Sequence, residues 1–271
     1  MGVITVWKAC TSEEGKGISE YHFHHGHCEL LLLLEGSIEM NIAGKNYRLD
    51  PNQMAVVSHL EPHDLKPLSY PYARIGIHID SKKLHECGIP PRLLSVLFYR
   101  GDDFSHVFDF PRAVWLVRQI YEEYASPKSN SGEMIDAYFY SLMLHLQRQN
   151  ASAFSSGDLY KNLNAEDARR FIELHCSEKI LIRDLAKNYF LSPSYFISLF
   201  RRYTGYTPKK YLLLCRLAQA RKLLLETDLS VKEVAVRAGY ESSNDFVRGF
   251  RESMGITPGV FRERYEKNDI K

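Results

Sequence analysis

Residues 182–208 of this chain read IRDLAKNYFLSPSYFISLFRRYTGYTP, and residues 231–258 read VKEVAVRAGYESSNDFVRGFRESMGITP. The offset between the two stretches is constant from Phe196 and Phe246 onward, but it is one residue shorter at Ala186 and Ala235. The change therefore falls in the turn between two helices, and a two-helix unit occurs twice. The recurring positions are Leu185-Ala186, Phe196, Phe200, Gly205, Thr207-Pro208 and Tyr211, matched by Val234-Ala235, Phe246, Phe250, Gly255, Thr257-Pro258 and Phe261.

Each copy predicts a helix, a tight turn and a second helix. In the first copy, Ser192 followed by Pro193 supplies an N-cap and a proline at the first helical position. In the second copy, Ser230 and Glu233 have the spacing of a capping box, and Gly239 can end the first helix in a left-handed conformation. The alanine that both copies carry permits the close approach that two steeply crossing helices need. The pattern is typical of a helix-turn-helix pair.

The second helix of each unit exposes side chains suited to DNA. Burying its phenylalanines turns the opposite face of the helix to solvent. Asn and Arg can make paired hydrogen bonds to a purine edge in the major groove, and Ser can bond a base or a phosphate. Ile197 suits a thymine methyl group, whereas Arg201 and Arg202 suit phosphates. We therefore predict DNA contacts from Ser194, Ile197, Ser198, Arg201, Arg202, Ser243, Asn244, Arg248 and Arg251.

A single predicted helix from Thr207-Pro208 to about Glu226 joins the two units. At the helical rise its length is about 28 Å, close to the ~34 Å that separates successive major-groove faces on one side of a duplex. The alternative is an all-helical bundle whose internal repeat has no DNA role. Helix capping, the spacing of the units and the outward arginines together favour DNA binding.

Short motifs extend this pattern over the whole region from Ile180 to Tyr265, about a third of the chain. They are Asp184-Leu185-Ala186, Ser192-Pro193-Ser194-Tyr195-Phe196, Phe200-Arg201-Arg202-Tyr203-Thr204-Gly205, Thr207-Pro208, Arg216-Leu217 with Ala220, and Ile256-Thr257-Pro258 with Phe261-Arg262. This set resembles the DNA-binding domain of the AraC/XylS family of bacterial transcription regulators. The resemblance implies base contacts at Ser194, Ile197 and Ser198 in the first unit and at Ser243, Asn244, Asp245 and Arg248 in the second.

Asp245 has two interpretations. Its carboxylate can accept a hydrogen bond from a cytosine amino group, or it can interact with the N-terminal amides of its own helix. The second role is favoured here, so Asp245 is left out of the predicted DNA contacts.

Charge is distributed unevenly along the chain. Residues 165–271 carry 20 Lys and Arg against 14 Asp and Glu, whereas residues 1–164 carry 15 against 19. Basic residues are thus concentrated around the repeat, as in a nucleic-acid-binding domain. The five Cys are scattered without Cys-x-x-Cys spacing, which favours reduced thiols in the cytoplasm. The apolar run Leu30 to Leu34 is far too short to span a membrane, and no membrane partner is expected.

The part of the chain before about Asp80 predicts short antiparallel strands. They lie at 30–34, 37–43, 46–49, 54–58 and 72–79, separated by turn residues. Such spacing suggests a barrel or jelly roll. The series His22-x-His24, Glu29 and Gly36 also resembles the first motif of the cupin barrel, with His63 at the place of the second motif's histidine. A β-barrel of this kind is also what the family resemblance implies for a regulatory domain.

These histidines leave three interpretations open, of which the simplest makes Glu29 and His63 polar residues whose hydrogen bonds are satisfied in the barrel interior. His22, His24, Glu29 and His63 can converge on one metal ion, because residues two apart on a strand face the same side. Placing the motif one residue later selects His25 instead and leaves the set incomplete. The favoured interpretation is hydrogen bonding to an organic effector, with no metal or other cofactor, as the family resemblance implies. The predicted effector-binding residues are Trp7, His24, His25, Glu29, Tyr47, His63, Arg74 and His78.

Two further helices are predicted at 111–124 and 133–149. Apolar residues surround much of the second one, which indicates burial on more than one side. The resemblance favours dimerisation through these helices, and a hairpin packed only within one chain is the alternative. The expected fold is a two-domain α+β protein. It comprises a cupin-like effector and dimerisation domain at 1–150, a linker at 151–164, and an all-α domain at 165–271 with helix-turn-helix units at about 181–204 and 230–254.

Together these features predict a ligand-responsive transcription regulator, most often an activator in this family, and not an enzyme. Its expected partners are double-stranded DNA, a small-molecule effector such as a sugar, a second copy of the chain, and RNA polymerase. Two alternatives stay open. One is a metal-dependent cupin enzyme fused to a DNA-binding domain, and the other is a regulator controlled only by its abundance.

Overall fold

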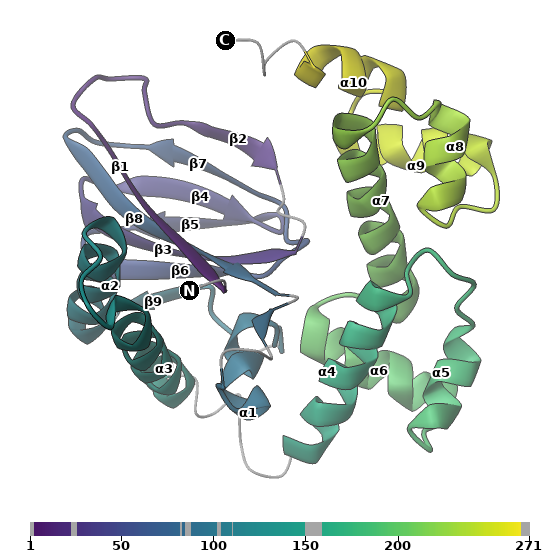
Figure 1. Cartoon of the computed structure of the whole chain (residues 1–271), viewed down its shortest axis with the longest axis horizontal. Helices are drawn as coiled ribbons and strands as arrows, with labels where there is room; N and C mark the ends of the chain where they lie inside the picture. Colours follow the sequence, from purple (N-terminus) through teal and green to yellow (C-terminus); the bar gives the residue numbers. More distant parts are fainter. Residues whose placement is uncertain are drawn as a thin grey trace. The chain divides into compact units, whose positions relative to one another are not determined.

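The structure, a computed structural model, describes residues 3–22, 26–81, 83–84, 88–101, 104–109, 111–149 and 159–266. The chain divides into two compact units, Met1–Leu163 and Asn164–Lys271. The first is rich in strands and the second is helical (Figure 1), as the sequence predicts. Of the described residues, none belongs to a helix long and apolar enough to cross a membrane.

The strands of the first unit form two antiparallel sheets. One sheet has the order β1-β8-β3-β6-β9 and the other has the order β2-β7-β4-β5. The five predicted strands are confirmed, and β1, β2, β7 and β9 complete the sheets. The strands are β1 (Ile4–Thr11), β2 (Ser19–His22), β3 (His27–Glu35), β4 (Ile38–Ile42), β5 (Lys45–Leu49), β6 (Gln53–Val57), β7 (His63–Pro67), β8 (Tyr72–Asp80) and β9 (Val107–Asp109).

A shared apolar core lies between the two sheets. Leu31 and Leu33 of β3 meet Ile38 and Met40 of β4 there, all of them fully buried. The alternate residues Leu30 and Leu32 are buried as well, on the opposite face of the same strand. The run of leucines therefore forms a strand covered on both faces, which is why its sequence lacks the polar alternation of a half-exposed strand. In place of the expected barrel, the strands form two separate sheets packed over one core.

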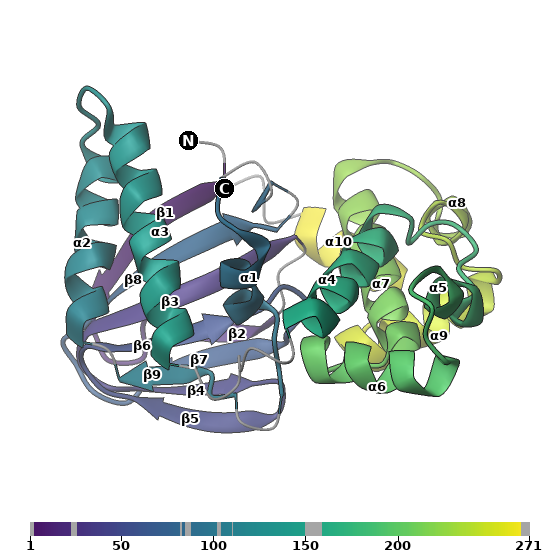
Figure 2. The same ribbon diagram turned by 90° about the horizontal axis from the view of Figure 1, so that it is seen from below.

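Helices cover the outer face of the five-stranded sheet (Figure 1, Figure 2). The hairpin of α2 (Pro111–Ala125) and α3 (Ser131–Gln149) packs through α2 on β1 and β8, and it follows the short helices α1 (Pro91–Leu94) and η2 (Ser95–Leu97). Ile135, Phe139 and Leu142 of α3 are buried, whereas Trp115 of α2 is 57% exposed. The predicted helices are confirmed, and one side of the hairpin remains open to solvent.

The second unit consists of helices, with bounds α4 (Leu159–Leu174), α5 (Ile182–Asn188), α6 (Pro193–Thr204), α7 (Pro208–Glu226), α8 (Val231–Arg237), α9 (Ser243–Met254) and α10 (Pro258–Glu266). Helix α4 begins inside the range predicted as a linker. Residues 151–158 of that linker lie outside the described part of the chain.

The predicted capping residues stabilise the helix ends of both helix-turn-helix units. The Ser192 hydroxyl accepts the amide hydrogen of Tyr195, and Ser230 and Glu233 make both hydrogen bonds of a capping box. Gly205 and Gly255 end α6 and α9 in the left-handed conformation, with φ of 79° and 73°. These local interactions explain why the sequence alone located the four helices of the repeat.

Candidate functional site

Helix α6 of the first helix-turn-helix unit exposes the side chains that the sequence predicts to contact DNA. Phe196 and Phe200 are buried against the rest of the unit. Ser194, Ile197 and Ser198 lie exposed on the opposite face, as do Arg201 and Arg202 in the last turn. The surface is polar with one aliphatic side chain, and its two guanidinium groups lie at the helix end. It is suited to holding a phosphate backbone and contacting a methyl group.

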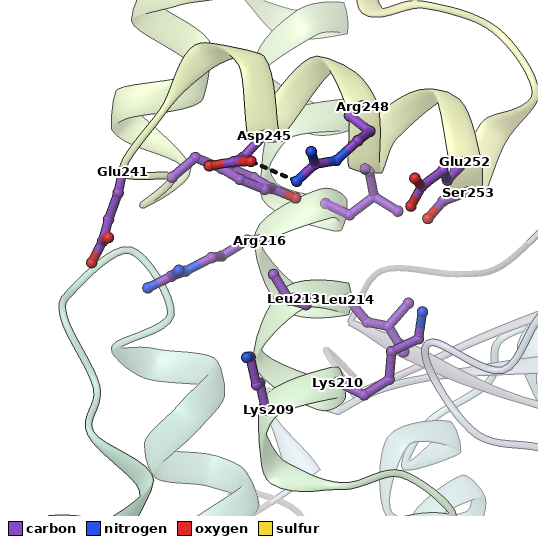
Figure 3. A pocket seen from close by; sticks show the side chains of 13 residues that line it. Lys209, Lys210, Leu213, Leu214, Arg216, Glu241, Asp245, Arg248, Glu252 and Ser253 are labelled. Carbon is purple, nitrogen blue, oxygen red and sulfur yellow. Dashed lines mark hydrogen bonds and ion pairs between the residues drawn. The ribbon is translucent and has the colours of Figure 1, made fainter.

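Helix α9 of the second helix-turn-helix unit carries side chains that are better suited to hydrogen bonding with bases. Asn244, Arg248 and Arg251 are exposed, and Ser243 is half-buried. A guanidinium nitrogen of Arg248 donates a 2.6 Å hydrogen bond to the Asp245 carboxylate one turn earlier (Figure 3). This exposed ion pair contributes little to stability, but it orients the planar guanidinium of Arg248.

The N-capping role that we favoured for Asp245 is filled by another residue. The hydroxyl of Ser242 accepts the amide hydrogens of Asn244 and Asp245 at 3.1 and 3.4 Å. The Asp245 carboxylate accepts from Arg248 instead. The correction follows from geometry, because the N-cap side chain sits at the helix end, whereas a residue in the first turn can reach the side chain one turn further on.

A hollow of about 490 Å³ lies between α7 and α9 (Figure 3). Lys209, Lys210 and Arg216 of α7 line it together with Arg248 of α9 and the exposed Leu213. Arg216 is held in place, since it donates to the backbone carbonyls of Cys176 and Glu178. The two lysines are basic residues near α9 that are not among the DNA contacts predicted from the sequence. Their signal was their position directly after Thr207-Pro208, in the first turn of the joining helix.

The first helix-turn-helix unit is attached to α4 through a buried charge network. Arg169, only 1% exposed, donates to Glu166 at 2.6 and 2.7 Å and to Glu173 at 2.5 Å. The hydroxyls of Tyr203 on α6 and Tyr211 on α7 donate to these same two carboxylates. Burial alone would lower the pKa of Arg169, but the two carboxylates raise it well above its ordinary value. The guanidinium therefore stays charged and fixes the position of α6 relative to α4.

The second helix-turn-helix unit is attached to the loop after α4 by close backbone packing. Gly239, at φ +86°, ends α8 in the left-handed conformation that the sequence predicts. A Cβ atom there would lie 2.7 Å from the Cα of Ser177, so the backbone of the loop after α4 leaves no room for a side chain. The corresponding residue of the first unit is Phe190, which has a φ of 56° and a side chain that is 98% exposed. Close backbone packing thus occurs in one copy only.

The strand-rich unit, Met1–Leu163, holds a separate cavity of about 170 Å³ between its two sheets. Strand register builds it, because β2 pairs His22 with His63 of β7, and β3 pairs Glu29 with His78 of β8. Leu31, Met40 and Leu65 form the aliphatic part of its lining. The lining residues are Trp7, Ser19, His22, Glu29, Leu31, Met40, His63, Leu65, Arg74 and His78.

Glu29 and His63 form the buried polar centre of this cavity. The His63 Nε2 atom lies 3.2 Å from a Glu29 carboxylate oxygen, and their side chains are 3% and 5% exposed. The other ring nitrogen, Nδ1, lies 2.9 Å from the carbonyl oxygen of Glu61. Burial alone would lower the pKa of His63, but its hydrogen bond to Glu29 and the charge of that carboxylate outweigh burial and raise this pKa.

Trp7 and Arg74 cover another part of the cavity. The Arg74 guanidinium lies 4.7 Å from the centre of the Trp7 ring, and β1 places Trp7 opposite Gly76 of β8. A Cβ atom at Gly76 would come within 2.2 Å of the ring, so a glycine is required for Trp7 to lie across β8. The Trp7 Nε1 and Arg74 Nε atoms are buried and have no hydrogen-bond partner in the described protein. Both are donors and can serve a bound molecule.

The structure brings together Trp7, Glu29, His63, Arg74 and His78, five of the eight residues predicted for the effector. His24 and His25 lie outside the described residues. Tyr47 is not among the lining residues, because its hydroxyl bonds to Nδ1 of His106 at 2.9 Å. Ser19 and Leu65 line the cavity and were missed, since their strands β2 and β7 were not predicted.

A second buried carboxylate supports the cavity from behind. Glu61 binds Arg100 through hydrogen bonds of 2.6 and 2.8 Å and His106 through one of 3.1 Å. Burial alone would raise the pKa of Glu61, but the charge of Arg100 and these hydrogen bonds hold it far below its ordinary value. Because the carbonyl of Glu61 also bonds to His63, this ion pair fixes one wall of the cavity.

Comparison with known proteins matches residues 185–264 to the helix-turn-helix domain family. The regulatory protein PocR of Salmonella typhimurium is 29% identical over 122 residues, which cover 45% of this chain and 40% of PocR. The lactose operon transcription activator of Staphylococcus xylosus is 23% identical over 245 residues, covering 89% of this chain and 85% of that protein. The chain thus spans less than half of the first relative but most of the second.

Among solved structures, ToxT from Vibrio cholerae with a bound unsaturated fatty acid has a similar fold. Its TM-score is 0.58, and the match covers 96% of this chain and 94% of ToxT at 12% sequence identity. A likeness at this level of identity concerns the fold, which comprises the sheets of the first unit and the helices of the second.

Proposed function

The chain belongs to the AraC/XylS family of transcriptional regulators, and from this premise we propose that it binds two adjacent major-groove segments of DNA under the control of a small polar effector. The observation that carries the proposal is the repeated helix-turn-helix unit, with exposed Arg201 on α6 and exposed Arg248 on α9. Helix α7 joins the units over 19 residues, about 28 Å at the helical rise, close to the ~34 Å between successive major-groove faces.

The two recognition helices have different roles in this proposal. Helix α9 reads bases, since Asn244 can pair with adenine and Arg248 with guanine. Helix α6 contributes phosphate contacts through Arg201 and Arg202 and an aliphatic contact through Ile197. The residues named on each helix lie on its exposed face.

The cavity between the sheets is the proposed effector site. Its donors Trp7, Arg74 and His78 and its acceptor Glu29 suit a small molecule that has hydroxyl or carboxylate groups. A sugar is the favoured class, because it combines hydroxyls with apolar C–H faces that pack on an aromatic ring. The Staphylococcus xylosus relative is named as an activator of a lactose operon. Activation of a carbohydrate operon, with contact to RNA polymerase, is the corresponding proposal for this chain.

Dimerisation through the helical hairpin completes the proposal. Trp115 and Tyr140 are exposed on α2 and α3, and the Trp115 and Tyr138 rings lie 5.6 Å apart. Such an aromatic surface suits a second copy of the same hairpin. Sedimentation of the full chain tests this, with a dimer expected for the native sequence and a monomer for Trp115→Glu. Identical masses for both would argue against the hairpin as the interface.

The decisive experiment is selection of bound duplexes from a random DNA pool by the purified full chain, with and without a mixture of candidate sugars. We expect enrichment of two asymmetric half-sites separated by about one helical turn. Arg248→Ala serves as the paired variant, because it should relax base preference in one half-site only. Failure to enrich any sequence in either condition would overturn the proposal.

A further inference from the structure

His22, Glu29 and His63 form a compact group at one end of the cavity. One ligand atom from each lies within 4.8 Å of the other two. Two ligands of a single ion, each about 2.1 Å from it, lie at most about 4.2 Å apart. His22 is half-buried at the end of β2, and the centre of its ring lies 4.3 Å from that of His63. A small rotation of His22 would therefore bring all three ligand atoms onto one ion.

The hydrogen bonding of His63 shows what its second nitrogen presents. A carbonyl oxygen can only accept, so Nδ1 must donate its hydrogen to the carbonyl of Glu61 at 2.9 Å. In the neutral ring, Nε2 then carries a lone pair, and this lone pair faces the Glu29 carboxylate at 3.2 Å. The contact therefore holds either a second proton, which makes His63 an imidazolium that donates to Glu29, or a metal ion in place of that proton. Metal-binding histidines characteristically donate their other N–H to a backbone carbonyl in this way.

We propose that His22, Glu29 and His63 bind a divalent first-row transition metal ion in the cavity. Two imidazoles and one carboxylate favour ions such as Zn²⁺, Fe²⁺ or Co²⁺, whereas Mg²⁺ and Ca²⁺ prefer sets made only of oxygen. This inference rests on the proposed effector site and gives it a specific chemistry. The ion is an effector itself or the anchor for one.

The rest of the cavity suits a further ligand of the same ion. Three protein ligands leave at least one coordination position open. The buried Nε–H of Arg74 and Nε1–H of Trp7 line the same cavity and have no acceptor in the described protein. A carboxylate or hydroxyl oxygen on the ion would give these donors an acceptor. The arrangement therefore favours an oxygen-bearing small molecule held jointly by metal and donors.

The test is metal binding by the full chain after it has been stripped with EDTA. We expect one Zn²⁺ per chain in calorimetric titration, and one Co²⁺ whose visible absorption reports nitrogen and oxygen ligands. His63→Gln and Glu29→Gln should each weaken binding about 100-fold or more, since loss of even an outer partner costs about 10–100-fold. His22→Gln should weaken it as well.

His175→Gln is the matched control. His175 also pairs with a glutamate, lying 2.9 Å from Glu178, but that pair is exposed on the other unit. This variant should bind Zn²⁺ like the native chain. Equal loss in the control, or undiminished binding in all three cavity variants, would overturn the site. Where a buried variant fails to fold, as circular dichroism would show, the Co²⁺ spectrum of the native chain and the half-buried His22→Gln variant still decide.

Running the DNA selection with stripped and Zn²⁺-loaded chain separates this inference from the proposed function. Selective DNA binding without stoichiometric uptake of Zn²⁺, Co²⁺ or Fe²⁺ would overturn the metal site and leave the regulator standing. Uptake of one ion lost in His63→Gln, without any selective DNA binding, would support the metal site and contradict the regulator.

Discussion

The two helix-turn-helix units are built from one sequence pattern, yet they differ in how they are anchored and in what they expose. The first is fixed to α4 by the buried Arg169, and its recognition helix presents mainly serine and isoleucine. The second is fixed by close backbone packing at Gly239, and its recognition helix presents Asn244 and Arg248. The shared frame thus supports different surfaces, because the buried positions of a helix specify its packing while the exposed ones can differ between the two copies.

The largest expected effect is on the anchor of the first unit. Arg169→Ala should lower the free energy of unfolding by about 3–5 kcal/mol, because it leaves Glu166 and Glu173 without their buried cation. Urea unfolding of the full chain measures this effect, and the exposed neighbour Arg170→Ala is the control. Comparable losses in the two variants would show that burial of the charge is not what matters.

The next effect is on the anchor of the second unit. Gly239→Ala should cost about 2–4 kcal/mol, because it combines the ~1–2 kcal/mol penalty of a left-handed residue with a clash against Ser177. Thermal unfolding reports this change. Gly249→Ala, on α9 with open space at its Cβ position, is the matched control and should be neutral or stabilising. A tolerated Gly239→Ala would show that the loop after α4 can move away.

A difference in DNA recognition should follow between the two units. Arg248→Ala should weaken binding to the cognate site by about 1–3 kcal/mol and relax base preference, whereas Arg202→Ala should weaken all sequences similarly and reduce the salt dependence. Titrations on cognate and scrambled duplexes at several salt concentrations measure both. Lys222→Ala, at the far end of α7 and within 3.7 Å of Glu226, is the control. Indistinguishable profiles for the two arginine variants would remove the base-reading role of α9.

The smallest effect on stability is expected at the turn of the first helix-turn-helix unit. Phe190→Gly should change stability by no more than about 1 kcal/mol, because relief of the left-handed backbone is offset by the greater entropy of an unfolded glycine. The ring is 98% exposed, so its removal loses almost no burial. Thermal unfolding beside Gly239→Ala sharpens the comparison between the two turns. A large destabilisation would mean that the Phe190 ring has a packing partner.

Sequence alone located the helix-turn-helix units because their signals are local. Ser192, Ser230 and Gly239 act within one or two turns of the chain, and helical periodicity separates Phe196 from its exposed neighbours without knowledge of the rest of the fold. The same reasoning predicted the helical hairpin. Asp245 was misjudged, because the choice between amides and a nearby arginine depends on side-chain geometry that no pattern encodes.

Tertiary structure decided the cavity. Pairing across strands distant in sequence brings His22 beside His63 and Glu29 beside His78, places Trp7 across Gly76, and directs Tyr47 to His106 instead. A shift of one residue in any of these registers would turn a side chain to the opposite face of its sheet. The sequence could therefore name candidate residues for this site but could not select among them, since strand register is set by long-range packing and not by local propensity.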